Sequence, residues 1–208
     1  CSYCDEHVNS GHDEDLCRHE NDEGCGYINN YSFRPSPKFF DHRNPNNVHV
    51  DTPYDNHTPY MGFELEVECK RDMGEIATDT VERLGEHAYL KSDGSLTYGF
   101  EVVTHPHTLE SYQRAFDWRF LEMMSSNDVS SWRTTTCGLH VHISRSAFSS
   151  LVHQALFTHL IQNNAEQMQR LAGRSNSSWA KFGDGDAPVH RKVKGGAWDR
   201  YQAVNMVN

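Results

Sequence analysis

The sequence predicts an α+β fold in which an antiparallel sheet carries helices on one face. Short segments such as "GFELEVE" at residues 62–68 alternate apolar and polar residues, which is typical of a strand with one covered face. The stretch at 89–106 divides into two strand-like runs around the turn "SDGS", as expected of a hairpin-like pair. Helical segments occur between the strands in irregular order, which favours an antiparallel sheet over a regular strand–helix repeat.

The other predicted elements follow from the spacing of apolar residues. Amphipathic helices, with apolar residues at intervals of three and four, are expected over residues 74–88, 109–126 and 147–173. In the second of these, Tyr112, Phe116 and Phe120 share one stripe. Besides the hairpin, strands are expected over residues 60–68, 137–145 and 200–208, with a polar, glycine-rich loop over 183–196.

The composition argues against two classes of protein. A net charge of -10 with neutral histidine does not suit a general nucleic-acid coat, because phosphate binding needs Lys and Arg. We therefore expect no nucleic-acid partner. No run of about 18 apolar residues occurs, so we expect no membrane span either. The chain opens at Cys1 without a Met and stops at Asn208, directly after a strand-like run. We therefore expect a fragment of a longer protein, truncated at its C-terminus.

Three regions are expected along the chain: a cysteine-rich module over residues 1–30, a linker over 31–58 and the main domain over 59–208. The first region is dense in Cys, His, Asp and Glu and has few apolar residues. It cannot bury a core of its own, so it is either held together by metal or disordered. The segment over 31–58 is rich in Pro and Asn and has no periodicity, so we expect a linker or a wrapping loop there.

Four cysteines in the first region predict a structural zinc site. Cys1 and Cys4 have the spacing of a zinc-knuckle pair, and Cys17 and Cys25 complete a set of four thiolates. Because Cys17 and Cys25 are not a close pair, a neighbouring histidine is an alternative ligand. Disulfide bonds are the other explanation for these cysteines if the protein is secreted.

Strand 62–68 carries three carboxylates on one face, from Glu64, Glu66 and Glu68. Neighbouring carboxylates roughly 7 Å apart repel by about 2 kcal/mol at an effective dielectric constant of about 20. Salt screens this repulsion on a solvated face. In a cleft it must be offset by Arg or Lys, by protonation or by a bound cation. The strand is therefore either a solvated edge or part of a cation site.

Other strand-like segments add metal-ligating residues opposite apolar ones. "GFEVVT" contains Glu101, and "GLHVHIS" places His140 and His142 on one strand face. Carboxylates with one or two imidazoles form divalent-metal sites, and a mainly carboxylate set favours Mg²⁺ or Mn²⁺ over zinc. Taken singly, the histidines are also compatible with the core and Glu101 with the surface. Their recurrence on several strands favours a metal site.

Four motifs, in this order, resemble the amidoligases of phages and bacteria: "GFELEVE", "KSDGSLTYGFEVVTHP", "CGLHVHIS" and "RYQAVN". This family is related to glutamine synthetase and glutamate–cysteine ligase, and the resemblance covers about residues 60–208. It implies a glutamine-synthetase-like catalytic fold and an ATP-dependent ligase that uses Mg²⁺ or Mn²⁺. In such enzymes ATP phosphorylates a small-molecule or peptide carboxylate, and an amine displaces the phosphate. The resemblance also implies a phage gene, action in the host cytoplasm and a zinc module in front.

The resemblance implies roles for the acidic and imidazole residues. Glu64 and Glu66 match the E-x-E strand, which in the superfamily holds metal ions that bridge ATP phosphates. Glu101 matches the glutamate of the G-x-E-V strand. Of the H-x-H pair, His140 is implied at the metal and His142 near the nucleotide phosphate.

Four further residues match family motifs. Lys91 and Asp93 match the K-x-D-G-S turn and are candidate cofactor-binding residues. Arg200 and Asn205 match an R-x-x-x-x-N strand near the substrate, with Arg200 expected beside the acyl phosphate and Asn205 at the cofactor. The family continues with an arginine-bearing strand, whereas this chain stops at Asn208.

Two other functions stay open. One is a metal-dependent hydrolase, because an H-x-H strand with carboxylates also activates water on zinc. The excess of glutamates over imidazoles counts against it. The other is a non-enzymatic adaptor, in which the zinc module sits on a decayed ligase fold.

Overall fold

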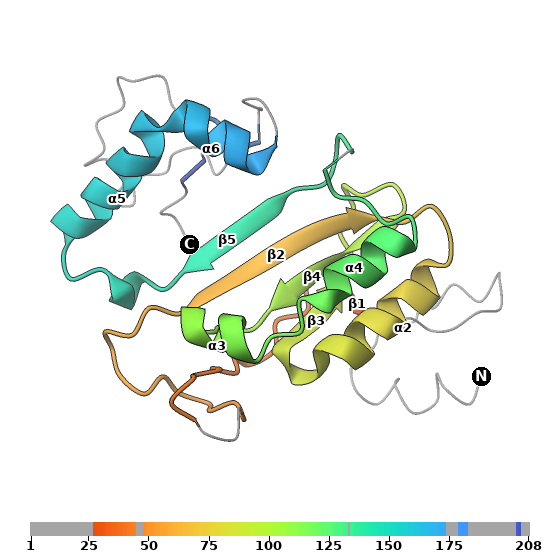
Figure 1. The fold of residues 1–208 in the computed structure, drawn as a ribbon, viewed down its shortest axis with the longest axis horizontal. Coiled ribbons are helices and arrows are strands. Elements are labelled where there is room, and N and C mark those ends of the chain that lie inside the picture. Colours follow the sequence, from red (N-terminus) through yellow and green to blue (C-terminus); the bar gives the residue numbers. More distant parts are fainter. Residues whose placement is uncertain (1–26, 45–47, 133, 174–178, 183–202, 205–208) are drawn as a thin grey trace. The chain divides into compact units, whose positions relative to one another are not determined.

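The computed structural model describes residues 27–44, 48–132, 134–173, 179–182 and 203–204, and Figure 1 shows its elements. The chain forms two compact units, Cys1–Ala147 and Phe148–Asn208. Six residues with predicted roles lie outside the described residues: Cys1, Cys4, Cys17, Cys25, Arg200 and Asn205. The predicted glycine-rich loop 183–196 lies outside them as well.

The first unit is built on a five-stranded sheet with the strand order β1-β3-β4-β2-β5. The strands are β1 (Ile28–Asn29), β2 (Met61–Glu68), β3 (Ala88–Lys91), β4 (Gly99–Thr104) and β5 (Leu139–Ile143). All neighbours pair antiparallel except β1 and β3, which are parallel. The predicted α+β class is confirmed, but the sheet is mixed rather than antiparallel. The parallel pair arises because the chain before the predicted linker adds a two-residue strand to the edge of β3.

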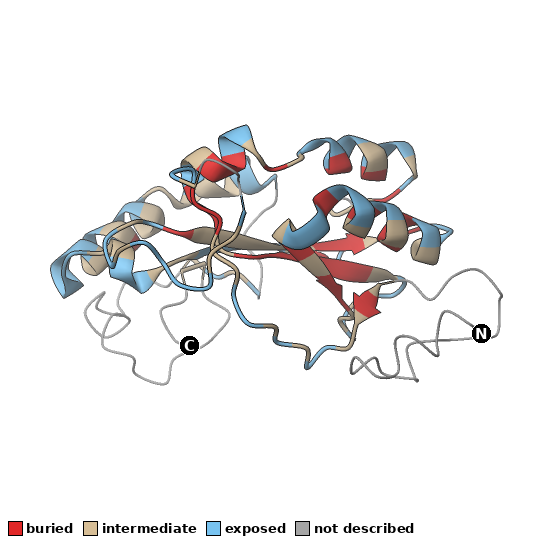
Figure 2. Cartoon of the chain, turned by 90° about the horizontal axis from the view of Figure 1, so that it is seen from below, coloured by how far each residue is buried: buried red, intermediate tan, exposed pale blue. Residues whose placement is uncertain are grey.

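Three helices cover one face of this sheet: α2 (Met73–Leu84), α3 (Leu109–Arg114) and α4 (Arg119–Ser126) (Figure 1). The alternation in β2 decides which face they cover, because Val67 belongs to the same core as Phe100 and Val102 of β4. On the helical side the core includes Ile76 and Phe120. Figure 2 shows the buried residues concentrated on the strands and on helix surfaces of this unit.

The single helix predicted over 109–126 is wrong, because tertiary contacts divide it into α3 and α4. Thr108 caps α3, its hydroxyl accepting a hydrogen bond from Ser111 N at 3.2 Å. At the break the Trp118 indole donates to the Tyr112 carbonyl at 2.8 Å. That bond satisfies a carbonyl that a continuous helix would use, so the chain turns and Phe116 enters the core.

The second unit contains α5 (Leu151–Asn163) and α6 (Ala165–Ala172). The long helix predicted over 147–173 is interrupted at Asn164, whose side-chain amide donates to the Leu160 carbonyl at 2.8 Å. The Asn164 backbone N–H donates to the same carbonyl at 3.3 Å, and side-chain bonds of this kind compete with the helical backbone pattern. In the first unit, short 3-10 helices occupy Gly85–His87 and Arg145–Ala147. No helix in the described part of the chain is long and apolar enough to span a membrane.

A strap before β2, residues 31–40, packs against the end of the sheet through imidazole rings. Phe40 N donates to the Pro106 carbonyl at 2.9 Å, and its ring stacks on His87 and His107 with centroids at 4.1 and 4.6 Å. His105 Nδ1 accepts a hydrogen bond from Lys38 N at 3.3 Å. Burial, reinforced by neighbouring positive charge, lowers the pKa of His105 to about 4 and that of His107 to about 3. These rings pack as neutral groups.

The histidine packing predicts acid sensitivity of the fold. A histidine whose folded-state pKa lies below its unfolded value takes up a proton on unfolding, so stability falls as pH drops from about 6.5. Each such histidine lowers the free energy of unfolding by at most about 1.4 kcal/mol per pH unit. Urea unfolding between pH 7 and about 5, above the usual carboxylate range, should show a shallower pH slope for His107→Gln than for the wild type. The control is the same substitution at an exposed histidine, His57→Gln, which should leave the pH slope as in the wild type. An unchanged slope in His107→Gln would contradict the interpretation.

Candidate metal centre

The face of the sheet opposite the helices carries polar residues in two cross-strand rows. Strand pairing places Lys91 opposite Glu101, and Glu101 opposite Glu66. Two residues back along β2, Glu64 lies opposite His140 of β5. Four strands thus bring their charged residues together on one surface.

The pairing of β4 with β2 depends on a glycine. Gly99 lies opposite Glu68 at the start of β4. A Cβ atom added to Gly99 would lie 1.9 Å from the Val67 carbonyl oxygen, far inside van der Waals contact. Any other residue would push the strands apart there, close to the pair formed by Glu66 and Glu101.

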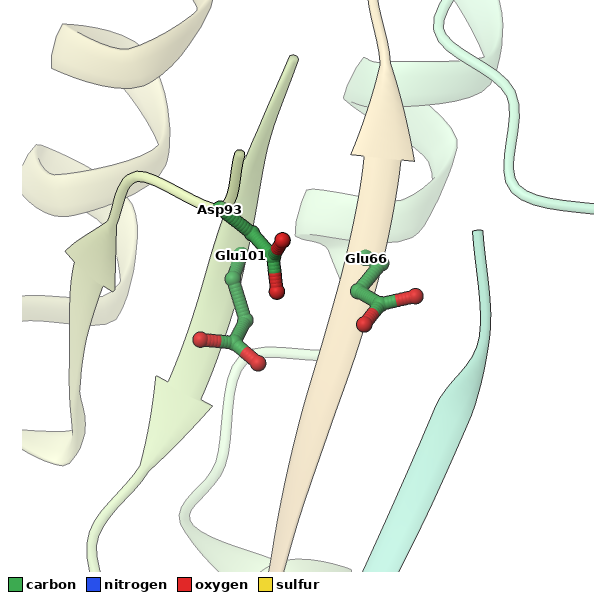
Figure 3. Close-up of side chains that lie close together, drawn as sticks. All are labelled: Glu66, Asp93 and Glu101. Atoms are coloured by element: carbon green, nitrogen blue, oxygen red, sulfur yellow. The ribbon is translucent and has the colours of Figure 1, made fainter. Parts of the chain in front are cut away.

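Three carboxylates form the centre of the face. One oxygen from each of Glu66, Asp93 and Glu101 lies within 4.8 Å of the others, and no other such group of metal-ligating side chains occurs among the described residues. Figure 3 shows Glu66 and Glu101 on neighbouring strands and Asp93 on the segment that follows β3. The Ser95 amide donates to Asp93 Oδ1 at 2.7 Å. In an octahedral Mg²⁺ site, oxygens at about 2.1 Å from the ion lie up to about 4.2 Å apart, so modest side-chain rotation suffices for joint ligation.

Glu66 is the buried member of this group that lacks a side-chain partner. It is 8% exposed, and no side-chain hydrogen bond or ion pair to its carboxylate occurs in the part of the chain that the structure describes. Burial raises the pKa of Glu66, Asp93 and Glu64 raise it further, and the His140 charge and the Gly138 amide oppose them. A buried carboxylate without a cation is costly. The site therefore favours either a proton or a metal ion at Glu66.

Glu101 differs because it has a cation beside it. Its Oε2 atom lies 3.4 Å from the Lys91 ammonium, and both residues are buried, at 4% and 5% exposure. Burial raises the pKa of Glu101, with a contribution from the Glu64 charge, while Lys91 acts in the opposite direction. One ammonium thus faces a group of three carboxylates.

Glu64 forms a separate cluster with the two histidines of β5. His140 Nδ1 lies 3.1 Å from Glu64 Oε2, and His142 Nε2 lies 3.3 Å from Glu64 Oε1. Hydrogen bonds from both imidazoles hold the pKa of Glu64 far below its usual range. The Glu64 carboxylate in turn raises the pKa of His140. Both imidazoles are more than half exposed, so the histidines line the rim of the site rather than its floor.

Gly138 leaves open space between the two clusters. A Cβ atom at Gly138 would lie 3.2 Å from Glu66 Oε2 and 3.7 Å from His140 Nε2. Since both atoms face the same small volume, His140 can reach a ligand held by Glu66.

Glu68, the last carboxylate of the strand, instead contacts loops: it accepts hydrogen bonds from the Thr136 hydroxyl at 2.6 Å and the Thr97 amide at 3.2 Å.

The structure groups the predicted residues more finely than the sequence does. It brings Glu66 and Glu101 together with Asp93, and it places Glu64, His140 and His142 in the adjacent cluster. The sequence leaves the role of Asp93 open. The signal that could have found it is the alternation of residues 89, 91 and 93, which continues the polar face of β3 into the turn.

Comparison with known proteins adds no relative. No family model, curated protein or solved structure matches the chain.

The charge imbalance at Glu66 predicts that removing the charge stabilises the metal-free protein. Glu66→Gln keeps the shape and removes a buried carboxylate whose raised pKa makes its ionised form unfavourable above that pKa. We expect the free energy of unfolding at pH 7.5, in chelator, to rise by about 1 kcal/mol. Exposed Glu82 supplies the matched control, Glu82→Gln, which should change little. Destabilisation by Glu66→Gln in urea unfolding would show that the carboxylate is already compensated.

Proposed function

We propose that the chain is an ATP-dependent carboxylate–amine ligase of glutamine-synthetase-like fold, whose Mg²⁺ or Mn²⁺ is held by Glu66, Asp93 and Glu101. The observation that carries the proposal is the Glu66 carboxylate, which is buried, has no side-chain partner among the described residues and lies beside two further carboxylates. Oxygen-only ligation of this kind suits Mg²⁺, which is bound by carboxylates together with substrate phosphates. The motif resemblance of residues 60–208 supplies the reaction class.

The proposed reaction has two steps. A carboxylate oxygen attacks the γ-phosphorus of ATP, the bond to the bridging oxygen breaks, and an acyl phosphate and ADP result. An amine then attacks the acyl carbon, loses a proton and releases phosphate, leaving an amide. The metal ion supplies charge neutralisation for the phosphates. The side chains that hold it must also bring two anions, nucleotide and carboxylate, onto one face of the sheet.

Other residues take roles around this centre in the proposal. His142 and Asn205 contact the nucleotide, and Arg200 neutralises the acyl phosphate. Cys1, Cys4, Cys17 and Cys25 bind a structural zinc ion that stabilises the N-terminal region without taking part in the chemistry. The proposed setting is the host cytoplasm of a phage, where ATP is plentiful.

A hydrolase is the second candidate, and one observation favours it. Glu64 lies between His140 and His142 at 3.1 and 3.3 Å, and two imidazoles with one carboxylate also form a zinc site that activates water. This cluster is exposed and its carboxylate is already hydrogen-bonded. The buried Glu66 carboxylate, which has no such side-chain partner among the described residues, gives the ligase the stronger support.

Metal binding tests the proposal without knowledge of the substrate. The full chain should bind Mn²⁺ with loss of the free-ion paramagnetic resonance signal, and Glu66→Gln should weaken that binding at least about tenfold. The matched Glu82→Gln control should bind as the wild type does. Mn²⁺ binding that is the same in Glu66→Gln and wild type would remove Glu66 from the metal site.

Turnover then separates the candidate functions. With Mg²⁺, ATP, mixed amino acids as carboxylates and hydroxylamine as the amine, the ligase produces ADP and hydroxamates, and Glu66→Gln abolishes both products. Ester hydrolysis with zinc and without nucleotide would favour the hydrolase. A folded protein with neither activity would favour the adaptor.

A further inference from the structure

Lys91 occupies an unusual place for a lysine. It is 5% exposed, and no other Lys or Arg is buried among the residues that the structure describes. Its ammonium lies 3.4 Å from Glu101 Oε2, which is longer than the 2.7–2.9 Å or so typical of a charge-assisted hydrogen bond. The ammonium therefore neutralises part of the acidic group without being tightly bound to one oxygen.

The strap that leads into the sheet adds a second cation beside Lys91. The Tyr31 ring centroid lies 5.2 Å from Lys91 Nζ and 5.8 Å from the Arg34 guanidinium carbon. Arg34 Nη1 donates to the Tyr31 and Phe33 carbonyls, both at 2.8 Å, which fixes the guanidinium in place. Two cations thus share one aromatic ring, and one of them, Lys91, lies beside Glu101.

The strap also contacts β3 through an aromatic pair. Phe33 packs edge-on against Tyr89 of β3, with ring centroids 5.5 Å apart. Burial raises the pKa of Tyr89, and the charges of Glu64, Glu101 and Arg34 all act on its hydroxyl. Arg34 and these two glutamates therefore act on the same hydroxyl, so the strap adds a positive charge on the β3 side of the site.

We propose that Lys91 is a displaceable internal counter-ion, which leaves Glu101 when a divalent cation binds and then, with Arg34, holds the anionic oxygens of a polyphosphate. The inference rests on the proposed metal site at Glu66, Asp93 and Glu101. It gives Lys91, a cofactor-binding candidate from the motif resemblance, a specific role, and it adds Arg34 from the predicted linker.

The physical basis is competition between two cations for the same carboxylates. A divalent ion on the three carboxylates repels the nearby ammonium. It also neutralises the Glu101 carboxylate, whose negative charge otherwise attracts that ammonium. The lysine stem is flexible and its head is a point charge, so Nζ can move to an anion that the metal brings. Metal and polyphosphate are therefore coupled through Lys91, and couplings of this kind typically change affinity about 5- to 150-fold.

Lys91→Met gives opposite effects on the two ligands. Free Mn²⁺ should bind about tenfold more tightly than to the wild type, because the competing ammonium is gone. The Mn²⁺–tripolyphosphate complex should bind about tenfold more weakly, because the phosphates lose a cation. Calorimetric titration of the full chain measures both. A lysine with only a structural role would weaken both ligands or neither.

Two sets of variants guard against trivial explanations. Lys38→Met makes the same charge change at a lysine paired with Glu86 at 2.9 Å, and it should leave both affinities unchanged. Because Lys91→Met leaves Glu101 unpaired and can impair folding, exposed Arg34 provides a second test. Arg34→Gln should weaken the Mn²⁺–tripolyphosphate complex about tenfold and leave free Mn²⁺ binding unchanged.

The outcomes separate this inference from the proposed function. If Lys91→Met binds free Mn²⁺ no more tightly than the wild type, or if Lys91→Met and Arg34→Gln retain full tripolyphosphate binding, the counter-ion role is overturned and the metal site stands. If the wild type binds no Mn²⁺, or Glu66→Gln binds it equally well, the metal site itself falls and this inference falls with it.

Discussion

The buried charge of Glu66 is the constraint on which the organisation of this face depends. Alternation along β2 sends its apolar residues into the helical core and its glutamates to the other face, so the packing that stabilises the sheet also fixes where the carboxylates lie. Moving Glu66 away would require a slip of the strand by one residue, which would also expose Val67. The protein therefore keeps an unfavourably buried carboxylate because the same strand supplies part of its core.

The neighbouring glutamates on this face, Glu64 and Glu101, are compensated in two different ways. On the β5 side, His140 and His142 hydrogen-bond Glu64 and keep it ionised at the exposed rim. On the β3 side, Lys91 offsets Glu101 in a buried position. Glu66 lies between these two arrangements and shares neither as a direct side-chain partner among the described residues. An added cation would complete the balance.

How far the sequence predicts this arrangement depends on the range of the interactions involved. Alternation is local, so the shared face of Glu64 and Glu66 and the pairing of His140 with His142 on one strand follow from the sequence. Asp93 can be found by extending that alternation from β3 into the turn, whereas Arg34 lies in a linker without periodicity, and only tertiary packing brings it to the Tyr31 ring beside Lys91. The division of the predicted helix at 109–126 has the same origin, because the Trp118 indole binds the Tyr112 carbonyl. The parallel strand β1 has only two residues, which is too short for an alternating pattern to predict it.

Diffraction at the manganese absorption edge from crystals of the full chain soaked in Mn²⁺ would test the central claim most directly. The account predicts an anomalous peak within about 2.3 Å of one oxygen from each of Glu66, Asp93 and Glu101. Such a peak would identify the three carboxylates as the metal centre. A peak held by His140 and His142 instead, or none on this face of the sheet, would contradict it.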